Sequence, residues 1–119
     1  FIKMDESLEE GALRELKEET NLTVKPKEII AVRSRIRDEF STDCYIIFSL
    51  EYIGGQLQCD GYEIDSAKFF SIEDIQNMEN IIPLSRILIC SYFQNKTQLI
   101  PRSKLPPYTP DNSELKLYL

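Results

Sequence analysis

The sequence predicts an α/β fold with a mixed β-sheet, and three segments carry this prediction. Residues 8–20 and 81–93 have the periodicity of helices with one apolar face, and residues 43–53 are rich in β-branched and aromatic residues. The order of strands and helices departs from the regular βαβ alternation of a doubly wound fold, so we expect a mixed sheet. A chain of 119 residues suits a single domain, 1–119, with its own core.

The first predicted helix runs from Leu8 to Thr20. Ser7 and Glu10 have the S-x-x-E spacing of a capping box, which opens a helix. The apolar positions that share one face of this helix are Leu8, Ala12, Leu13 and Leu16. Pro26 prevents the helix from continuing past about Val24, because the residue before a proline avoids the helical region.

Several carboxylates of this helix fall on or beside its apolar face. At about 100° per residue, Glu19 lies inside the apolar arc and Glu15 on its edge. Glu18 lies one step further round, next to Arg14. Buried charges are disfavoured unless they are paired or hold a metal, and a hard divalent cation bound by carboxylate oxygens would satisfy them. A solvated helix with the ion pairs Glu10–Arg14 and Arg14–Glu18 is the alternative.

The middle of the chain predicts two strands and the segments that join them. Residues Glu28–Arg35 carry the apolar run of a strand, and Ile36–Thr42 is polar and aperiodic, as a loop would be. Residues Asp43–Ile53 give the strongest strand signal in the chain, and a glycine pair closes it with a turn. Residues Gln56–Glu63 are expected to form a loop or a short returning strand.

The remaining third predicts one strand, two helices and a proline-containing end. Residues Ser66–Phe70 have the composition of a strand, and Ile72–Met78 that of a short helix capped by Ser71. A longer helix is predicted over Ile81–Phe93, with a proline near its start. Its apolar stripe, expected to pack on the sheet, consists of Leu84, Ile87, Leu88 and Tyr92. Residues Lys96–Leu119 contain four prolines and are expected to be loop-like.

Charge and composition exclude some classes of function. The net charge is −6, from twenty acidic and fourteen basic residues, which argues against nonspecific binding of long nucleic acid. A small anionic substrate stays compatible, because bound metal ions can offset the repulsion. The chain contains no His, so acid–base chemistry must come from carboxylates, Lys, Tyr or metal-bound water. No apolar run has the length of a membrane span, so no membrane partner is expected.

Three cysteines, Cys44, Cys59 and Cys90, are scattered and form no C-x-x-C pair. Such a set indicates reduced thiols, and we therefore expect a cytoplasmic protein. Cys44 and Cys90 stand in apolar runs, where a small hydrophobic side chain is suitable.

The segment from Glu6 to Leu22, ESLEEGALRELKEETNL, resembles the Nudix box. The matching positions are Glu6, then after seven residues Arg14-Glu15, the hydrophobic Leu16, Glu18-Glu19 and the hydrophobic Leu22. Two features differ from the family motif: its opening Gly would precede Phe1, and its closing Gly is replaced by Asn21. The position after the helix favours a left-handed conformation, which Asn tolerates best after Gly.

The resemblance implies an α/β/α sandwich, with the helices 8–20 and 81–93 on opposite faces of the mixed sheet. Nudix domains normally carry a strand or two ahead of the box, so we expect the chain to be an N-terminally incomplete domain. The implied reaction is hydrolysis of the diphosphate linkage of a nucleoside diphosphate joined to another group. The implied cofactor is Mg²⁺ or Mn²⁺, and the implied partner is a small nucleotide-derived substrate, with a homodimer compatible.

The resemblance also implies roles for the carboxylates of the box. Glu15 and Glu19 would hold the metal, and Glu18 would be a further ligand or the base. Arg14 would position Glu18 through charge-assisted hydrogen bonds. Glu6 would be a helix-entry or outer residue.

Two further sets of residues enter through the resemblance. Glu63 precedes the aromatic pair Phe69-Phe70 and a short acidic helix, as a loop glutamate of Nudix domains does, and is therefore a candidate ligand or base. Arg33, Arg35 and Arg37 fall near a loop that borders the substrate in this family, and strand alternation places them on one side. They are candidates for phosphate contacts, although surface arginines are usually solvated.

Two other classes of function fit the same residues. A Nudix-like domain could bind a nucleotide and sense it without cleaving it. A plain interaction domain could carry the acidic helix as a solvated surface, and neutralising Glu19 would then be harmless.

Overall fold

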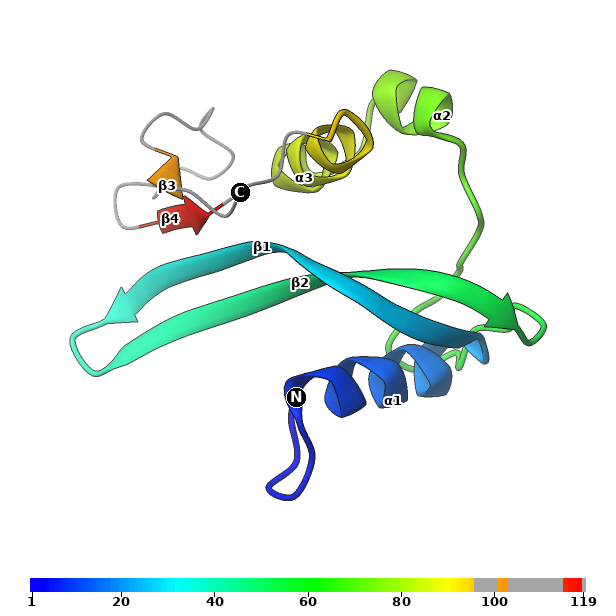
Figure 1. Ribbon diagram of the computed structural model, residues 1–119, viewed down its shortest axis with the longest axis horizontal. Coiled ribbons are helices and arrows are strands. Elements are labelled where there is room, and N and C mark those ends of the chain that lie inside the picture. The colour runs from blue at the N-terminus through cyan, green and yellow to red at the C-terminus, as the bar shows by residue number, and fades with distance from the viewer. Residues whose placement is uncertain (96–100, 103–114, 119) are drawn as a thin grey trace. The chain divides into compact units, whose positions relative to one another are not determined.

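The structure is a computed structural model, and it describes residues 1–95, 101–102 and 115–118. The described elements, in chain order, are α1 (Leu8–Thr20), β1 (Thr23–Asp38), β2 (Ser41–Gly54), α2 (Ile72–Asn77), α3 (Pro83–Phe93), β3 (Pro101–Arg102) and β4 (Leu115–Tyr118) (Figure 1). They belong to two compact units. The first unit contains Phe1–Glu28 and Phe48–Phe69, and the second contains the other described residues.

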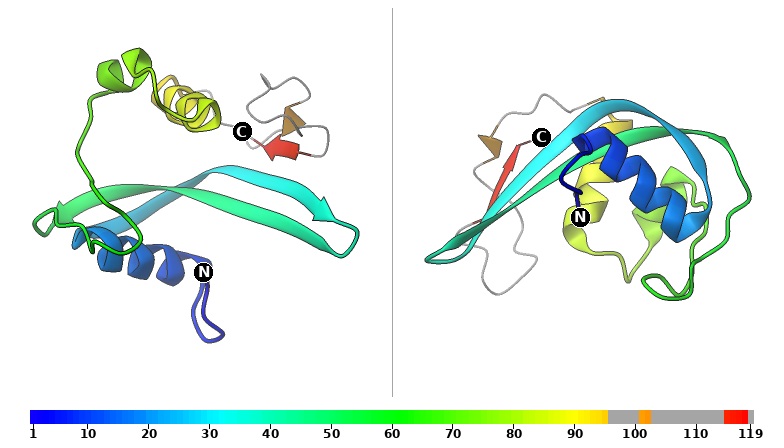
Figure 2. Two further views of the ribbon diagram at one scale, coloured as in Figure 1. Left: turned by 180° about the vertical axis from the view of Figure 1, so that it is seen from behind. Right: turned by 90° about the horizontal axis from the view of Figure 1, so that it is seen from below.

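The described strands form one sheet in the order β2-β1-β4-β3. β1 and β2 form a long twisted hairpin, which Figure 2 shows from two further sides. β4 pairs antiparallel with β1 over Val32–Arg35, and β3 pairs antiparallel with β4. The α/β class is confirmed. The sheet was predicted to be mixed, and the pairings β1–β4 and β3–β4 within the described residues are antiparallel. Because α1 and α3 belong to different units, their placement on opposite faces stays a prediction, as does the single domain 1–119.

Helix α1 has the predicted bounds, and local side-chain bonds explain its start and its end. The Ser7 hydroxyl accepts the backbone N–H of Glu10 at 3.3 Å, and the Glu10 carboxylate accepts the N–H of Ser7 at 2.7 Å. This is the predicted capping box. Asn21 follows the helix with φ 60° and ψ 9°, and its N–H donates to the carbonyl of Lys17 at 2.9 Å. The left-handed conformation expected at this position is confirmed.

The predicted loop Ile36–Thr42 is wrong, because the two strands extend into it. β1 ends at Asp38 and β2 begins at Ser41, so two residues form the connection. The Asp38 carboxylate accepts the N–H of Phe40 at 2.8 Å and the hydroxyl of Ser41 at 2.8 Å. An aspartate that bonds the backbone two residues ahead stabilises a tight turn. The polar composition of the segment therefore belongs to the end of a hairpin.

The strand predicted over Ser66–Phe70 is also wrong. This segment is irregular, and within the described residues no strand pairs with it. Strand propensity largely reflects packing against neighbouring strands, so composition alone does not make a strand. The Phe69 ring instead lies edge-on to the Tyr52 ring, with 5.5 Å between the centroids. Of the two alternatives for Gln56–Glu63, the structure shows the loop.

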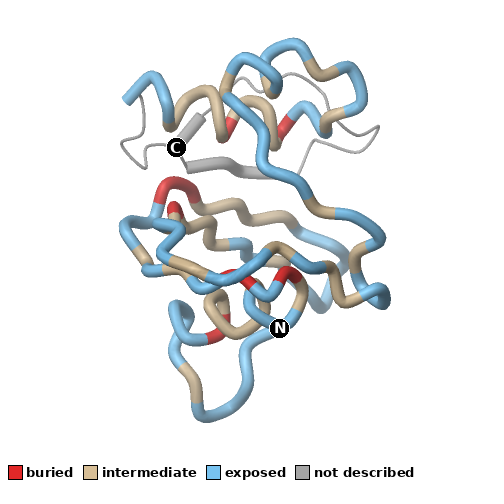
Figure 3. Tube along the Cα trace, turned by 90° about the vertical axis from the view of Figure 1, so that its right-hand side faces the viewer, coloured by how far each residue is buried: buried red, intermediate tan, exposed pale blue. Residues whose placement is uncertain are grey.

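The two later helices agree with their predictions, and α3 contributes to the core of the second unit. Ser71 caps α2, and Pro83 occupies the first turn of α3. Buried Leu84 and Leu88 of α3 cluster with Ala31 of β1, which is fully buried. Ile47 and Ile87 pack against this cluster. Three of the four residues of the predicted stripe, Leu84, Ile87 and Leu88, thus pack with residues of the sheet, and Figure 3 marks the described buried positions in red.

Within the predicted loop-like segment Lys96–Leu119, the short strands β3 and β4 correct the expectation. The rest of that segment lies outside the described residues. Among the cysteines, Cys59 and Cys90 are partly buried and Cys44 is exposed, although its run is apolar. In the part of the chain that the structure describes, each helix is too short or too polar to cross a membrane.

Candidate metal site

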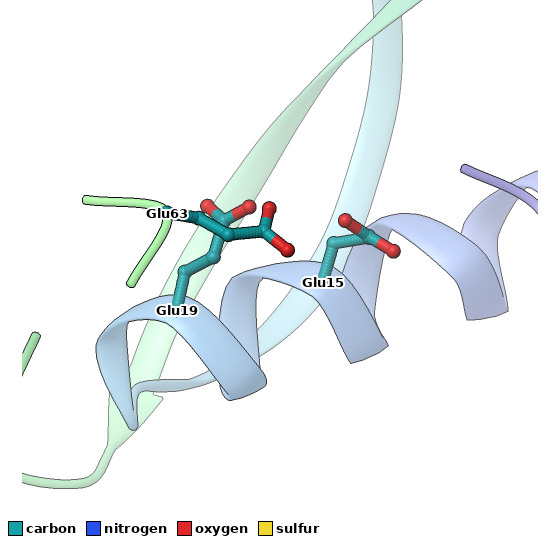
Figure 4. Close-up of side chains that lie close together, drawn as sticks. All are labelled: Glu15, Glu19 and Glu63. Carbon is teal, nitrogen blue, oxygen red and sulfur yellow. The ribbon is translucent and has the colours of Figure 1, made fainter. Parts of the chain in front are cut away.

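Three carboxylates meet in the first unit: Glu15 and Glu19, one turn apart on α1, and Glu63 from the loop after β2 (Figure 4). Each offers one oxygen, and these oxygens lie within 4.8 Å of one another. Glu15 and Glu19 are partly buried, whereas Glu63 is exposed. The sequence suggested Glu15 and Glu19 as ligands and Glu63 as an additional one, and the fold brings all three together.

Arg14 binds three glutamates in and before α1, one of which, Glu15, belongs to the three-carboxylate group. Its guanidinium binds Glu6 through two hydrogen bonds, Nη2 to Oε1 at 2.7 Å and Nε to Oε2 at 3.0 Å. Its Nη1 donates to Glu15 at 2.7 Å and to Glu18 at 3.0 Å. The Arg14 side chain is only 20% exposed. Charge-assisted and bidentate bonds of this kind fix geometry, so Arg14 holds Glu15 at the edge of the three-carboxylate group.

The glutamates of the box therefore differ in their surroundings, because some belong to the three-carboxylate group and others bond Arg14 outside it. Glu18 bonds Arg14 as expected, but its side chain is 59% exposed and lies outside the three-carboxylate group. Its role as ligand or base stays a prediction. Glu6 is bound to Arg14 and not to the group, as expected for an outer residue. Of the ion pairs expected on a solvated face, Arg14–Glu18 forms, while Glu10 bonds the backbone of Ser7 instead.

The pKa values of the two helix carboxyls are shifted in opposite directions. Hydrogen bonding from Arg14 lowers the pKa of Glu15. Burial raises the pKa of Glu19, and the negative charges of Glu63 and Glu15 raise it further. A cation between these oxygens would offset both causes of the Glu19 shift. The donor set consists of carboxylate oxygens, which are the ligands that Mg²⁺ and Mn²⁺ prefer, so the residues fit such an ion.

The loop that carries Glu63 is attached to the end of α1 by backbone bonds. The N–H of Gln58 donates to the carbonyl of Thr20 at 2.9 Å, and the N–H of Asp60 donates to the carbonyl of Glu19 at 3.1 Å. The Asn21 side chain also donates to the carbonyl of Gln56 at 3.0 Å. Sequence reasoning missed these contacts. The pair Asp60-Gly61 before Glu63 is a recognisable turn signal, although it does not reveal what the turn contacts.

The three arginines of β1 have partners on β2. The Arg33 guanidinium lies 3.8 Å from the centre of the Tyr45 ring. Arg35 and Arg37 lie 3.9 and 3.5 Å from the Asp43 carboxylate. Because Asp43 and Tyr45 are two residues apart on a strand, the arginines share one face, as alternation suggested. Their contact with phosphate stays a prediction.

Because of Glu6, the free energy of unfolding should depend on pH in the acid range. Its bonds to Arg14, followed by a backbone bond from Lys3, lower its pKa from 4.5 to about 2. A depressed carboxyl pKa stabilises the folded state above the unfolded pKa, and this contribution is lost as the pH falls from about 4.5 to 2. We expect Glu6→Gln to unfold more easily at pH 7 and the difference from wild type to shrink over that range. Urea unfolding at pH 7, 4 and 2.5 measures it, and a difference that is constant with pH would contradict this assignment.

Comparison with known proteins gives a consistent result. The family model described as NUDIX domain matches residues 1–89. A Methanocaldococcus jannaschii protein named ADP-ribose pyrophosphatase is 35% identical over 79 residues, covering 66% of this chain and 46% of that protein. Nudix hydrolase 6 of Arabidopsis thaliana is 35% identical over 78 residues, covering 64% and 28%. NAD-capped RNA hydrolase NudC of Pseudomonas fluorescens is 28% identical over 92 residues, covering 77% and 32%. The chain spans less than half the length of these relatives.

Proposed function

The chain belongs to the NUDIX domain family, and on that premise we propose that its protein is a metal-dependent pyrophosphohydrolase. Its substrate would be a nucleoside diphosphate joined to another group, cleaved at the diphosphate linkage. The observation that carries this proposal is the meeting of Glu15, Glu19 and Glu63 within 4.8 Å. A solvated acidic helix would not require a distant loop to add a third carboxylate to its half-buried face.

The three carboxylates would hold Mg²⁺ or Mn²⁺. When bound, such an ion offsets phosphate charge and makes water more acidic, so that a nucleophile is available near neutral pH. Arg14 keeps the Glu15 carboxylate in place at 2.7 Å. Glu63 is the exposed member of the group, and its oxygens can accept a proton from water. Glu18, held by Arg14 at 3.0 Å, is the other candidate for this proton.

The names of the relatives suggest which compounds to test first. The archaeal relative is named for ADP-ribose, which is a nucleoside diphosphate joined to a sugar. The NudC relatives are named for NAD-capped RNA. The net charge of −6 disfavours extensive contact with an RNA chain. We therefore propose that small compounds such as ADP-ribose and NAD are preferred to a capped RNA.

Removal of the metal tests the proposal directly. Hydrolysis of ADP-ribose, NAD, a nucleoside triphosphate and NAD-capped RNA would be followed by phosphate-product analysis, with Mg²⁺ and with EDTA. We expect cleavage of at least one diphosphate compound with Mg²⁺ and none with EDTA, and recovery when Mg²⁺ is restored. Cleavage that survives EDTA would contradict the metal site. Nucleotide binding without cleavage of any compound would instead identify a sensing domain.

A further inference from the structure

We propose that Asp60 is a positioning residue that holds Glu63 in the three-carboxylate group. This inference rests on the proposed metal site, and it adds a residue that lies outside the box. Asp60 contacts both parts of the site, since its backbone bonds residue 19 and its side chain bonds residue 63. It is therefore a direct link between the helix and the loop that supply the carboxylates.

The side chain of Asp60 binds three successive backbone N–H groups. Its Oδ1 accepts from Tyr62 at 3.1 Å, from Glu63 at 3.2 Å and from Ile64 at 3.2 Å. Its Oδ2 lies 3.4 Å from the N–H of Glu63. These bonds lower the pKa of Asp60, with the Tyr62 bond as the main cause. A carboxylate that is occupied in this way organises the loop and is not itself a member of the metal group.

The backbone of Asp60 fixes where this turn sits. Its N–H donates to the carbonyl of Glu19 at 3.1 Å, at the last turn of α1. Gly61 then reverses the chain with φ +75°, a left-handed conformation that residues with side chains rarely adopt. The result is that Glu63, although exposed and far along the chain, returns to the carboxylates of α1. Without the Asp60 side chain, the Glu63 backbone would lose its bonds to the turn while its carboxylate remained chemically intact.

A positioning role of Asp60 can be distinguished from an effect of its charge. The negative charge can be removed while an oxygen that accepts the backbone hydrogen bonds is kept. In Asp60→Asn, one oxygen remains to take the place of Oδ1, which makes the short bond to each of the three N–H groups. In Asp60→Ala, the acceptor is lost as well. A positioning role predicts that the Asn variant resembles wild type. A purely electrostatic role predicts that the two variants fail alike.

Binding of Mn²⁺, followed by electron paramagnetic resonance, tests the inference without relying on turnover. We compare wild type, Asp60→Ala, Asp60→Asn, Glu63→Gln and the double variant Asp60→Ala/Glu63→Gln. We expect Asp60→Ala to weaken Mn²⁺ binding about 10-fold or more, as loss of groups that orient metal ligands typically does. Asp60→Asn should stay within about 3-fold of wild type, because its amide oxygen keeps the hydrogen bonds and only their charge assistance is lost. In the Glu63→Gln background, Asp60→Ala should have no further effect.

Additive effects in the double variant would overturn the inference, because Asp60 would then act independently of Glu63. Equal losses in Asp60→Ala and Asp60→Asn would overturn it as well. Thermal unfolding checks that the variants are folded. Asp60→Ser replaces Asp60→Ala if the latter is not, and a smaller loss of Mn²⁺ binding is then expected, because the Ser hydroxyl accepts the same backbone bonds more weakly. The expected Mn²⁺ pattern in a protein that cleaves nothing would support Asp60 and contradict the hydrolase. Metal-dependent cleavage, together with additive effects of the two substitutions on Mn²⁺ binding, would support the hydrolase and contradict the role of Asp60.

Discussion

Replacing Glu19 with Gln is expected to lower turnover by more than about 100-fold, because loss of groups that merely orient metal ligands already costs about 10–100-fold. Glu19 is the member of the group whose pKa is raised by burial and by Glu63, and a cation would relieve both. Gln has nearly the same shape as Glu but lacks the charge, so it should leave the site assembled and poorly able to bind metal. Hydrolysis with Mg²⁺ and binding of Mn²⁺ both measure the effect.

The fold should tolerate this change. A raised carboxyl pKa means that the folded state disfavours the ionised form, so neutralising Glu19 should leave the free energy of unfolding at pH 7 unchanged or slightly higher. Glu9→Gln is the matched control, because Glu9 is exposed in the first turn of the same helix and lies outside the group. Both variants should unfold like wild type, and only Glu19→Gln should lose activity. Full activity in Glu19→Gln would contradict the assignment of Glu19 as a metal ligand.

Replacing Gly55 with Ala is expected to destabilise the first unit by about 2–6 kcal/mol, from backbone strain of roughly 1–3 and overpacking of roughly 1–3 kcal/mol. Gly55 has φ +88°, and an added Cβ would lie 2.6 Å from the carbonyl oxygen of Asn21. The backbone of Thr23 and Leu22 is nearly as close, at 3.1 and 3.2 Å. None of these backbone atoms can turn away as a flexible side chain would. The strain falls where the loop that carries Glu63 leaves β2.

Gly54→Ala provides the control one residue earlier. An added Cβ at Gly54 meets nothing within 4 Å, and its φ is not in the left-handed range. Ala should therefore be neutral there or stabilising by up to about 1 kcal/mol. Urea unfolding should distinguish the two variants, and Mn²⁺ binding should weaken only in Gly55→Ala. Equal stabilities would mean that the approach of Gly55 to Asn21 does not constrain the loop.

Sequence patterns predicted the helices well because the signals of a helix are local. The bounds of α1, its capping box and the left-handed Asn21 all depend on residues within one or two turns. The same holds for Ser71 at the start of α2 and for Pro83 in α3. Strands were predicted less well, since a strand needs a partner that its own residues do not specify. Ser66–Phe70 has a suitable composition and no such partner among the described residues, whereas polar Ile36–Asp38 is the end of β1.

The sequence by itself determined the family, the acidic helix and the candidate carboxylates, because the spacing of the box places Glu15 and Glu19 one helical turn apart. Only the tertiary structure decided which glutamate completes the group. Glu18 is close in sequence, but its position on the helix turns it to Arg14. Glu63 is distant, but backbone bonds from Gln58 and Asp60 return its loop to α1. Helix geometry follows from neighbouring residues, whereas a contact between distant parts of the sequence depends on how the whole chain packs.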